Sequence, residues 1–139
     1  MLIEISTADI ADFFDTFCRE FASFDGRRVG GLFIAPGVAL RSDGETQGFA
    51  TQQDIENYYQ SALDHYRSSG CAECRWRDLQ VSRISESSIL ATVSWDLVAK
   101  NMSLLKQWRQ AYFIARFSGQ MKIYGSAFVS DEYVDEWSR

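Results

Sequence analysis

Few side chains in this sequence are suited to acid–base chemistry in a buried site. Asp96 lies between Trp95 and Leu97 in an apolar stretch, and a carboxylate held among apolar side chains can serve as a general base. His65 is the only histidine of the chain, and histidine readily moves protons near neutral pH. Asp96 and His65 are therefore the two candidate catalytic residues.

Both residues also have a structural interpretation. The period of the stretch places Asp96 opposite the apolar set, so it would face outward or pair with Arg109 of the next strand, unless a bulge shifts the register. Arg109 could instead bind an anionic group of a ligand. His65 falls on the flank of a helical face, where water at a rim would satisfy its ring.

A second set of side chains is suited to binding. Tyrosine rings can line a pocket while their hydroxyls donate hydrogen bonds to a ligand oxygen. Each ring, taken singly, is also an ordinary core residue. The candidate ligand-binding residues are Phe14, Phe17, Tyr58, Tyr59, Trp95, Arg109, Tyr112 and Tyr124.

Cys71 and Cys74 form a CxxC motif, which can hold zinc or carry redox chemistry. A structural zinc needs four ligands, and the sequence has no second CxxC and no pair of histidines. Redox CxxC motifs usually open a helix, whereas this motif stands between a helical pattern and a strand pattern. We therefore predict two unpaired thiols, no metal site and no cofactor.

Apolar residues at helical spacing predict the first helix. Ser6, Thr7 and Asp9 are typical of a helix start, and Asp25-Gly26 of a helix end. Between these limits one narrow stripe carries the aromatic residues, and it needs a large apolar surface to face. The stripe consists of Ile10, Phe13, Phe14, Phe17, Phe21 and Phe24.

The next segments are predicted to be a short helix or turn over residues 27–33 and a hairpin of strands 38–42 and 45–49. Asp43-Gly44 turns the hairpin, because both positions favour positive φ. A further helix begins at Thr51 and stops around residues 68–70. One face of this helix presents Ile55, Tyr58, Tyr59, Ala62, Leu63 and Tyr66.

The second half changes to a period of two. The predicted strands are residues 74–84, 89–100, 106–117 and 121–129. The short connections between them favour an antiparallel meander. We therefore predict an α+β domain in which a strongly curved antiparallel sheet surrounds a hydrophobic hollow roofed by helices.

The strand over residues 106–117 is apolar on both faces. Trp108 and Tyr112 lie on one face, while Ala111 and Phe113 lie on the other. A strand of this kind is covered on both faces, and the helices of one small domain can cover only one. We therefore predict a homodimer through the outer face of the sheet.

Bulk properties narrow the class of protein. The 139 residues suit a single domain, residues 1–139, and 46% of them are hydrophobic, enough to fill a core. The net charge of -5, with scattered basic residues, argues against nucleic acid and acidic membranes as partners. No signal-peptide pattern or membrane-length apolar run is present, and three cysteines are an odd number, so we predict a cytoplasmic location. The tail over residues 131–139 is predicted to dock through Tyr133, Val134 and Trp137.

The order of these elements, with the phrases Thr92-Val-Ser-Trp95-Asp96-Leu and Trp108-Arg109-Gln-Ala-Tyr112, resembles the nuclear transport factor 2-like superfamily and its SnoaL-like branch. The closing Gly119-Gln-Met-Lys-Ile123 is also similar, although Met121 stands where the family often has Trp. The resemblance implies a cone-shaped sheet, with the three helices of the N-terminal half on its concave face and a pocket at the wide end. It covers nearly the whole chain but contains no catalytic signature.

Three functions follow as hypotheses. The first is a binding domain whose aromatic-lined pocket takes a small apolar or aromatic ligand. The second is an isomerase-, dehydratase- or cyclase-like enzyme acting on a small hydrophobic carbonyl compound, since the superfamily contains such enzymes. The third is a homodimeric interaction module without a ligand.

Overall fold

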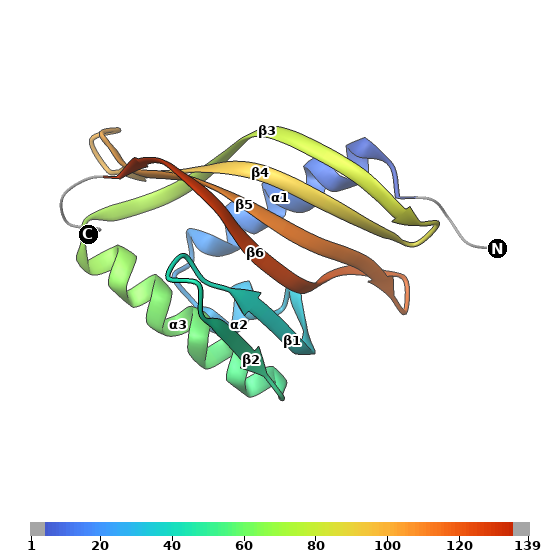
Figure 1. Ribbon diagram of the computed structural model, residues 1–139. Helices are drawn as coiled ribbons and strands as arrows, with labels where there is room; N and C mark the ends of the chain where they lie inside the picture. Colours follow the sequence, from blue (N-terminus) through green and yellow to red (C-terminus); the bar gives the residue numbers. More distant parts are fainter. Residues whose placement is uncertain (1–4, 135–139) are drawn as a thin grey trace.

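The computed structural model describes residues 5–134, with the side chains of residues 5–132 (Figure 1). The predicted docking of the tail through Tyr133, Val134 and Trp137 lies outside these side chains. The described chain forms three helices and six strands. None of these helices is long and apolar enough to cross a membrane. The cytoplasmic location stays a prediction.

Capping residues set the limits of the helices. Helix α1 (Thr7–Phe21) begins at a capping box in which Ser6 Oγ accepts from the Asp9 amide and the Asp9 carboxylate accepts from the Ser6 amide, both at 3.1 Å. It ends earlier than predicted, because Asp25 caps the start of α2 (Gly26–Gly30) by accepting from the Arg27 amide. Thr51 and Asp54 form a second capping box at the start of α3 (Gln52–Ser68).

The six strands form one sheet with the order β2-β1-β6-β5-β4-β3. Their bounds are β1 (Phe33–Leu40), β2 (Thr46–Phe49), β3 (Cys71–Ser85), β4 (Ser88–Ala99), β5 (Leu104–Phe117) and β6 (Gln120–Val134). Neighbouring strands are antiparallel, as predicted, except β1 and β6, which are parallel. β1 also begins five residues before the predicted position, and its pairing with β6 is irregular between Phe33 and Val38.

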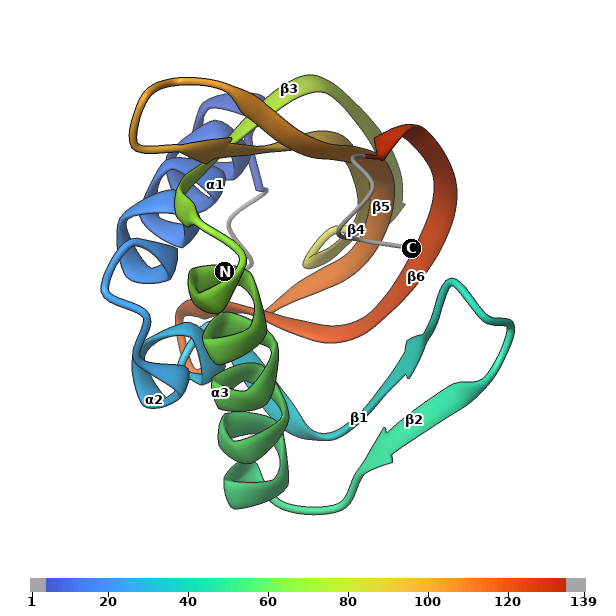
Figure 2. The same ribbon diagram turned by 90° about the vertical axis from the view of Figure 1, so that its left-hand side faces the viewer.

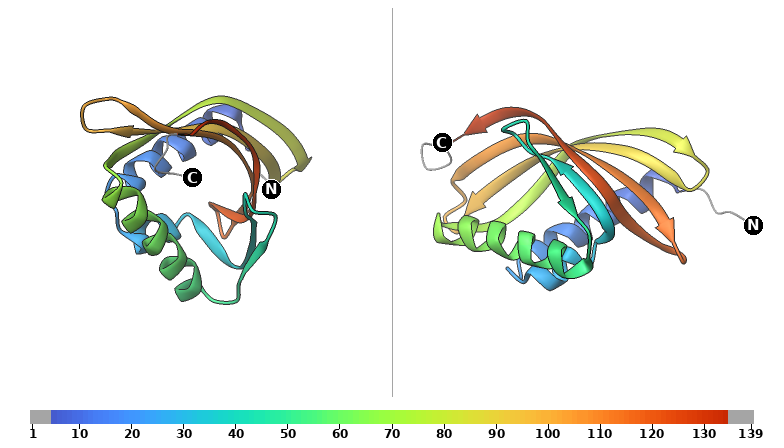
Figure 3. Two further views of the ribbon diagram at one scale, coloured as in Figure 1. Left: turned by 60° about the vertical axis from the view of Figure 1, so that its left-hand side comes forward. Right: turned by 60° about the horizontal axis from the view of Figure 1, so that its bottom comes forward.

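The sheet curves strongly, and the three helices lie on its concave side (Figure 2). β2 and β3 are its two edges, so the sheet does not close into a barrel. The two views of Figure 3 show α3 running across the opening between the two ends of the sheet. The predicted α+β class, with a cone-shaped sheet and helices on the concave face, is confirmed.

The core lies where the aromatic stripe of α1 meets β4. The Phe17 ring lies 4.9 Å from the Trp95 ring, and the Phe14 ring lies 5.9 Å from it. The inward-facing residues of β4 are all buried: Ile89, Ala91, Val93, Trp95 and Leu97. α1 is also tied to β3 by a hydrogen bond of 2.9 Å from Trp76 Nε1 to Asp15 Oδ1. The apolar surface that the stripe needed is therefore the concave face of the sheet.

Candidate functional site

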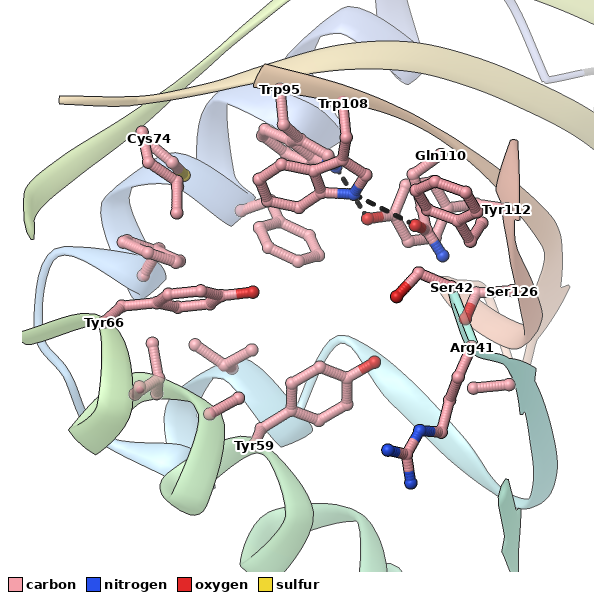
Figure 4. A pocket seen from close by; sticks show the side chains of 18 of the residues that line it. Arg41, Ser42, Tyr59, Tyr66, Cys74, Trp95, Trp108, Gln110, Tyr112 and Ser126 are labelled. Carbon is pink, nitrogen blue, oxygen red and sulfur yellow. Dashed lines mark hydrogen bonds between the residues drawn. The ribbon is translucent and has the colours of Figure 1, made fainter. Parts of the chain in front are cut away.

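A cavity of about 220 Å³ lies between the concave face of the sheet and the helices (Figure 4). α1, α2 and α3 line it with Phe17, Phe21, Val29, Tyr58, Tyr59, Ala62, Leu63 and Tyr66. β1 and the turn after it add Ala39, Leu40, Arg41 and Ser42. The other strands contribute Cys74, Trp95, Leu97, Lys106, Trp108, Gln110, Tyr112, Ser126 and Phe128. Long-range packing thus builds one site from all three helices and five of the six strands.

Aromatic rings make up most of the wall. Tyr59 stacks on Phe33 with ring centroids 4.5 Å apart, and Tyr58 packs edge-on against Tyr59 at 5.2 Å. Tyr66 lies nearly parallel to Trp108 at 6.5 Å. Rings held by other rings keep their positions, so the shape of the cavity wall does not depend on an occupant.

Two hydrogen bonds within the wall fix the orientation of its polar groups. Trp95 Nε1 donates to the Tyr112 hydroxyl oxygen at 2.7 Å, and Trp108 Nε1 donates to Gln110 Oε1 at 3.1 Å. An indole nitrogen can only donate, so both partners must use an acceptor atom here. The Nε2 amide of Gln110 consequently turns toward the cavity (Figure 4), and the Tyr112 hydroxyl keeps its hydrogen for another acceptor.

The charged residues that line the cavity, Arg41 and Lys106, are both basic. Lys106 Nζ lies 4.8 Å from the Trp108 ring centroid and 5.9 Å from that of Tyr66, so its ammonium sits against aromatic faces. Burial lowers the pKa of Lys106, although Asp131 opposes this. Arg41 is half exposed and pairs with Asp43 at 3.0 Å. Among the described residues that line the cavity, none is Asp, Glu or His.

Burial also raises the pKa values of buried tyrosine hydroxyls in the wall. It raises the pKa of Tyr66 to about 12 and raises the pKa values of Tyr59 and Tyr112 well above the ordinary value. These hydroxyls therefore stay protonated across the physiological range. The Tyr66 hydroxyl points into the cavity, and that of Tyr59 points across it toward Arg41 and Ser42 (Figure 4). They can act as hydrogen-bond donors.

The structure brings five of the eight predicted ligand-binding residues together around the cavity. They are Phe17, Tyr58, Tyr59, Trp95 and Tyr112. Phe14 does not reach it, because its ring is fully buried against Trp76, Trp95 and Tyr112. Tyr124 occupies a bulge of β6 between Ile123 and Gly125 and turns to the outer face of the sheet. There its hydroxyl bonds Ser88 Oγ at 2.8 Å, and its ring packs on Phe113.

The structure places Asp96 and Arg109 on the outer face, away from the cavity. The bulge of the β4–β5 pairing lies between Leu97 and Val98, beyond Asp96, so the register at Asp96 is regular and its side chain stays opposite Trp95. Asp96 accepts from Gln107 Nε2 at 2.8 Å and pairs with Arg77 at 3.2 Å, rather than with Arg109. Arg109 donates to Ser94 Oγ at 3.0 Å.

His65, the other catalytic candidate, also lies outside the cavity lining. It is exposed on α3, and its ring lies 5.9 Å from that of its chain neighbour Tyr66. One helical position separates the two residues, and that difference of about 100° turns Tyr66 inward and His65 outward. Neither candidate base from the sequence therefore reaches the cavity.

Sequence reasoning missed several lining residues. Lys106, Trp108 and Gln110 alternate with outward residues along β5 and share the face of Tyr112. That alternation was visible in the sequence and could have extended the site from Tyr112 back to Lys106. Ser126 and Phe128 could not be assigned in this way, because the bulge at Tyr124 reverses the faces of β6.

The cysteines meet in an unexpected pair. Cys71 and Cys74 carry free thiols, as predicted, and Cys74 lies against Cys18 of α1 with a sulfur–sulfur distance of 3.8 Å. Cys74 of the CxxC motif therefore contacts a thiol that lies outside the motif. Within residues 5–134 there is no group of three or more His, Cys, Asp or Glu side chains that could hold a metal ion.

Solved structures of low sequence identity share this architecture and define its class. A candidate calcium/calmodulin-dependent protein kinase II association domain from Xanthomonas campestris superposes with a TM-score of 0.68 at 21% identity, covering 93% of this chain and 91% of that one. Aln2 from a Streptomyces species gives 0.72 at 11% identity, covering 88% and 89%. ActVI-ORFA from Streptomyces coelicolor gives 0.71 at 14% identity, covering 89% and 96%.

At these identities the likeness shows the fold alone. A sequence profile of the family described as NTF2-like protein (DUF6841) matches residues 8–138, and the chain belongs to that family. The resemblance to the nuclear transport factor 2-like superfamily is thereby confirmed, while the assignment to its SnoaL-like branch stays a prediction. No curated protein matches the chain in sequence.

Proposed function

We propose that this protein binds a small, largely apolar or aromatic molecule in the cavity of Figure 4. The observation that carries the proposal is the cavity of about 220 Å³ whose aromatic walls are held in place by other rings. A preformed apolar cavity with a few fixed polar groups is the usual form of a small-molecule site. Drug-sized ligands occupy larger pockets than this one. A ligand with a single ring or two fused rings therefore fits this volume best.

The enzyme hypothesis receives less support. Proton transfer was assigned to Asp96 or His65, and neither lines the cavity. The wall offers protonated tyrosines, Cys74 and Lys106 instead. We therefore place binding ahead of isomerisation, dehydration or cyclisation.

Binding can be tested by titrating the purified protein with two-ring probes, 2-naphthamide and 2-naphthoate, and following tryptophan fluorescence. Trp95 and Trp108 line the cavity, so an occupant changes their emission. The variant Ala62→Trp fills the cavity from α3 and should abolish the response. Ser61→Trp adds the same ring at the neighbouring exposed position and should retain it.

Circular dichroism verifies that both variants fold, and Ala62→Phe is the smaller substitution if Ala62→Trp does not. The proposal is wrong if neither probe binds the unmodified protein. It is equally wrong if the cavity-filling variant binds the probes as well as the unmodified protein does.

A second proposal concerns the outer face of the sheet. We propose that two copies of this chain associate there, through an apolar surface made by Val38, Leu90, Phe113, Phe117 and Tyr124. Leu90 pairs with Phe113, Phe113 pairs with Gly125, and Gly125 pairs with Val38, so the apolar residues form a row across four strands. Val38 is 49% exposed and Phe117 36% exposed. Apolar residues gathered in this way are typical of a protein–protein contact.

Sedimentation velocity at micromolar concentration tests this association. A dimer would have about twice the 15.9 kDa of one chain. Phe113→Arg should yield monomers, since two buried cations would face each other across a symmetric interface. Val81→Arg changes an exposed apolar residue of β3 outside the apolar surface and should leave the dimer intact. A monomer of the unmodified protein at all concentrations would end the proposal.

A further inference from the structure

Two polar side chains of the cavity wall, Gln110 and Tyr112, present hydrogen-bond donors to the cavity. Gln110 Oε1 is occupied by Trp108 Nε1, which leaves the two hydrogens of its amide for the cavity. The Tyr112 oxygen is occupied by Trp95 Nε1, which leaves the hydroxyl hydrogen. A ligand atom that accepts hydrogen bonds can therefore meet both groups while the two contacts within the wall stay in place.

The donors form a row along one strand. Lys106, Gln110 and Tyr112 lie on the same face of β5, with the ring of Trp108 between the first two. Lys106 is half-buried at the start of the strand, while Tyr112 is only 5% exposed. The row thus runs from a cation near the rim to a neutral donor in the interior.

The cation is not neutralised within the cavity. No described lining residue carries a carboxylate, and Asp131, which influences Lys106, is exposed and lies outside the lining. The Lys106 ammonium rests on the faces of Trp108 and Tyr66, which attract a cation but cannot accept its hydrogens as an anion does. An anionic group of a ligand would supply such an acceptor inside the cavity.

We infer that the ligand is an organic anion, with a flat apolar body among the rings and a carboxylate or similar oxyanion held by Lys106 and the Gln110 amide. This inference rests on the proposed binding function and names the chemical class of its ligand. The Tyr112 hydroxyl would serve a second acceptor oxygen deeper in the cavity. Gln110 and Tyr112 are fixed before the ligand arrives, which reduces the ordering cost of binding.

The experiment compares three probes with the same two-ring body: 2-naphthoate, 2-naphthamide and 2-naphthylmethylammonium. We expect the carboxylate to bind at least roughly tenfold more tightly than the amide, since a hydrogen bond to a charged group is that much stronger. The ammonium probe should bind weakest, because it offers no acceptor and meets a like charge.

Variants assign the preference to a residue. Lys106→Met retains the length and apolar stem of the side chain and should remove the advantage of naphthoate over naphthamide. Lys100→Met, at the exposed turn after β4, removes the same charge away from the cavity and should preserve that advantage. The ratio of the two affinities is the readout, so a general loss of stability does not imitate the effect.

Different outcomes separate this inference from the binding function. If naphthamide binds as tightly as naphthoate, and Ala62→Trp abolishes both, the protein is a binding domain but its ligand class is not anionic. If Lys106→Met leaves the naphthoate preference unchanged, the assignment to Lys106 is wrong. If no probe binds in a manner sensitive to Ala62→Trp, the binding function itself fails.

Discussion

Cys18 and Cys74 place two thiols in contact, and their surroundings make them chemically unequal. The hydrogen bond from the Cys74 thiol lowers the pKa of Cys18, because it stabilises the Cys18 thiolate. Burial raises the pKa values of the Cys71 and Cys74 thiols, that of Cys71 to about 11. The thiolate is the nucleophilic form, so the half-buried Cys18 should be the most reactive cysteine in the chain.

The first prediction is that iodoacetamide alkylates Cys18 before Cys71 and Cys74 in the folded protein at pH 8. Peptide mass spectrometry over a time course gives the three rates. Cys74→Ala removes the thiol that stabilises the Cys18 thiolate and should slow alkylation of Cys18 several-fold, whereas Cys71→Ala should not. Alkylation of Cys71 first would contradict the order of reactivity.

At the scale of elements, the contact between α2 and α3 depends on the absence of a side chain. A Cβ at Gly26 would lie 2.5 Å from the Glu56 carbonyl oxygen and 2.7 Å from both the Cβ and the amide nitrogen of Gln60. Gln60 also accepts from the Gly26 amide at 2.7 Å. Backbone atoms surround this position, so a larger residue must displace α3, which carries Tyr58, Tyr59 and Tyr66 of the cavity wall.

We therefore predict that Gly26→Ala lowers the free energy of unfolding by about 1–3 kcal/mol, the usual effect of forcing atoms into a packed contact. Urea denaturation followed by circular dichroism measures the change. Gly48→Ala is the matched control in β2, because a Cβ there meets nothing within 4 Å. Equal effects of the two substitutions would show that the close approach of α2 and α3 is not limiting.

At the scale of the whole molecule, buried neutral groups make stability depend on alkaline pH. Tyr59, Tyr66 and Tyr112 keep their protons in the folded protein above pH 10, where an unfolded tyrosine loses its own. The unfolded chain then binds fewer protons than the folded one, so the free energy of unfolding falls as pH rises. Cys71, with its pKa raised to about 11, begins the same decline near pH 9.

We predict that the contribution of these groups to the free energy of unfolding is constant below about pH 9. Above about pH 10 the free energy of unfolding should fall by about 1.4 kcal/mol per pH unit for each buried tyrosine. For Tyr66 the loss ends near its folded pKa of about 12. Chemical denaturation at pH 8, 10 and 11 measures it. Tyr66→Phe should reduce the slope between pH 10 and 11, and an unchanged slope would contradict burial of that hydroxyl as the cause.

Local sequence patterns were sufficient to predict the two long helices, strand β4 and several residues of the cavity wall. The capping residues Ser6 and Thr51 marked both long helices, and the period of two in residues 89–100 marked β4 and its buried face. These features depend on neighbours a few residues away, so a sequence pattern contains them. The same patterns identified Phe17, Tyr58, Tyr59, Trp95 and Tyr112, all of which line the cavity.

Only the tertiary structure shows which side chains a change of strand register turns inward or outward, and which residues distant in sequence contact one another. The bulge at Tyr124 turns that ring outward and brings Ser126 inward, and a sequence pattern shows neither bulge nor face reversal. Asp96 forms an ion pair with Arg77 of a neighbouring strand, and the Cys74 thiol contacts that of Cys18, which lies 56 residues away in sequence on a helix. The donors in the cavity wall also depend on tertiary structure, because the Trp95–Tyr112 hydrogen bond requires the pairing of β4 with β5. The cavity itself forms only when the helices pack on that face of the sheet.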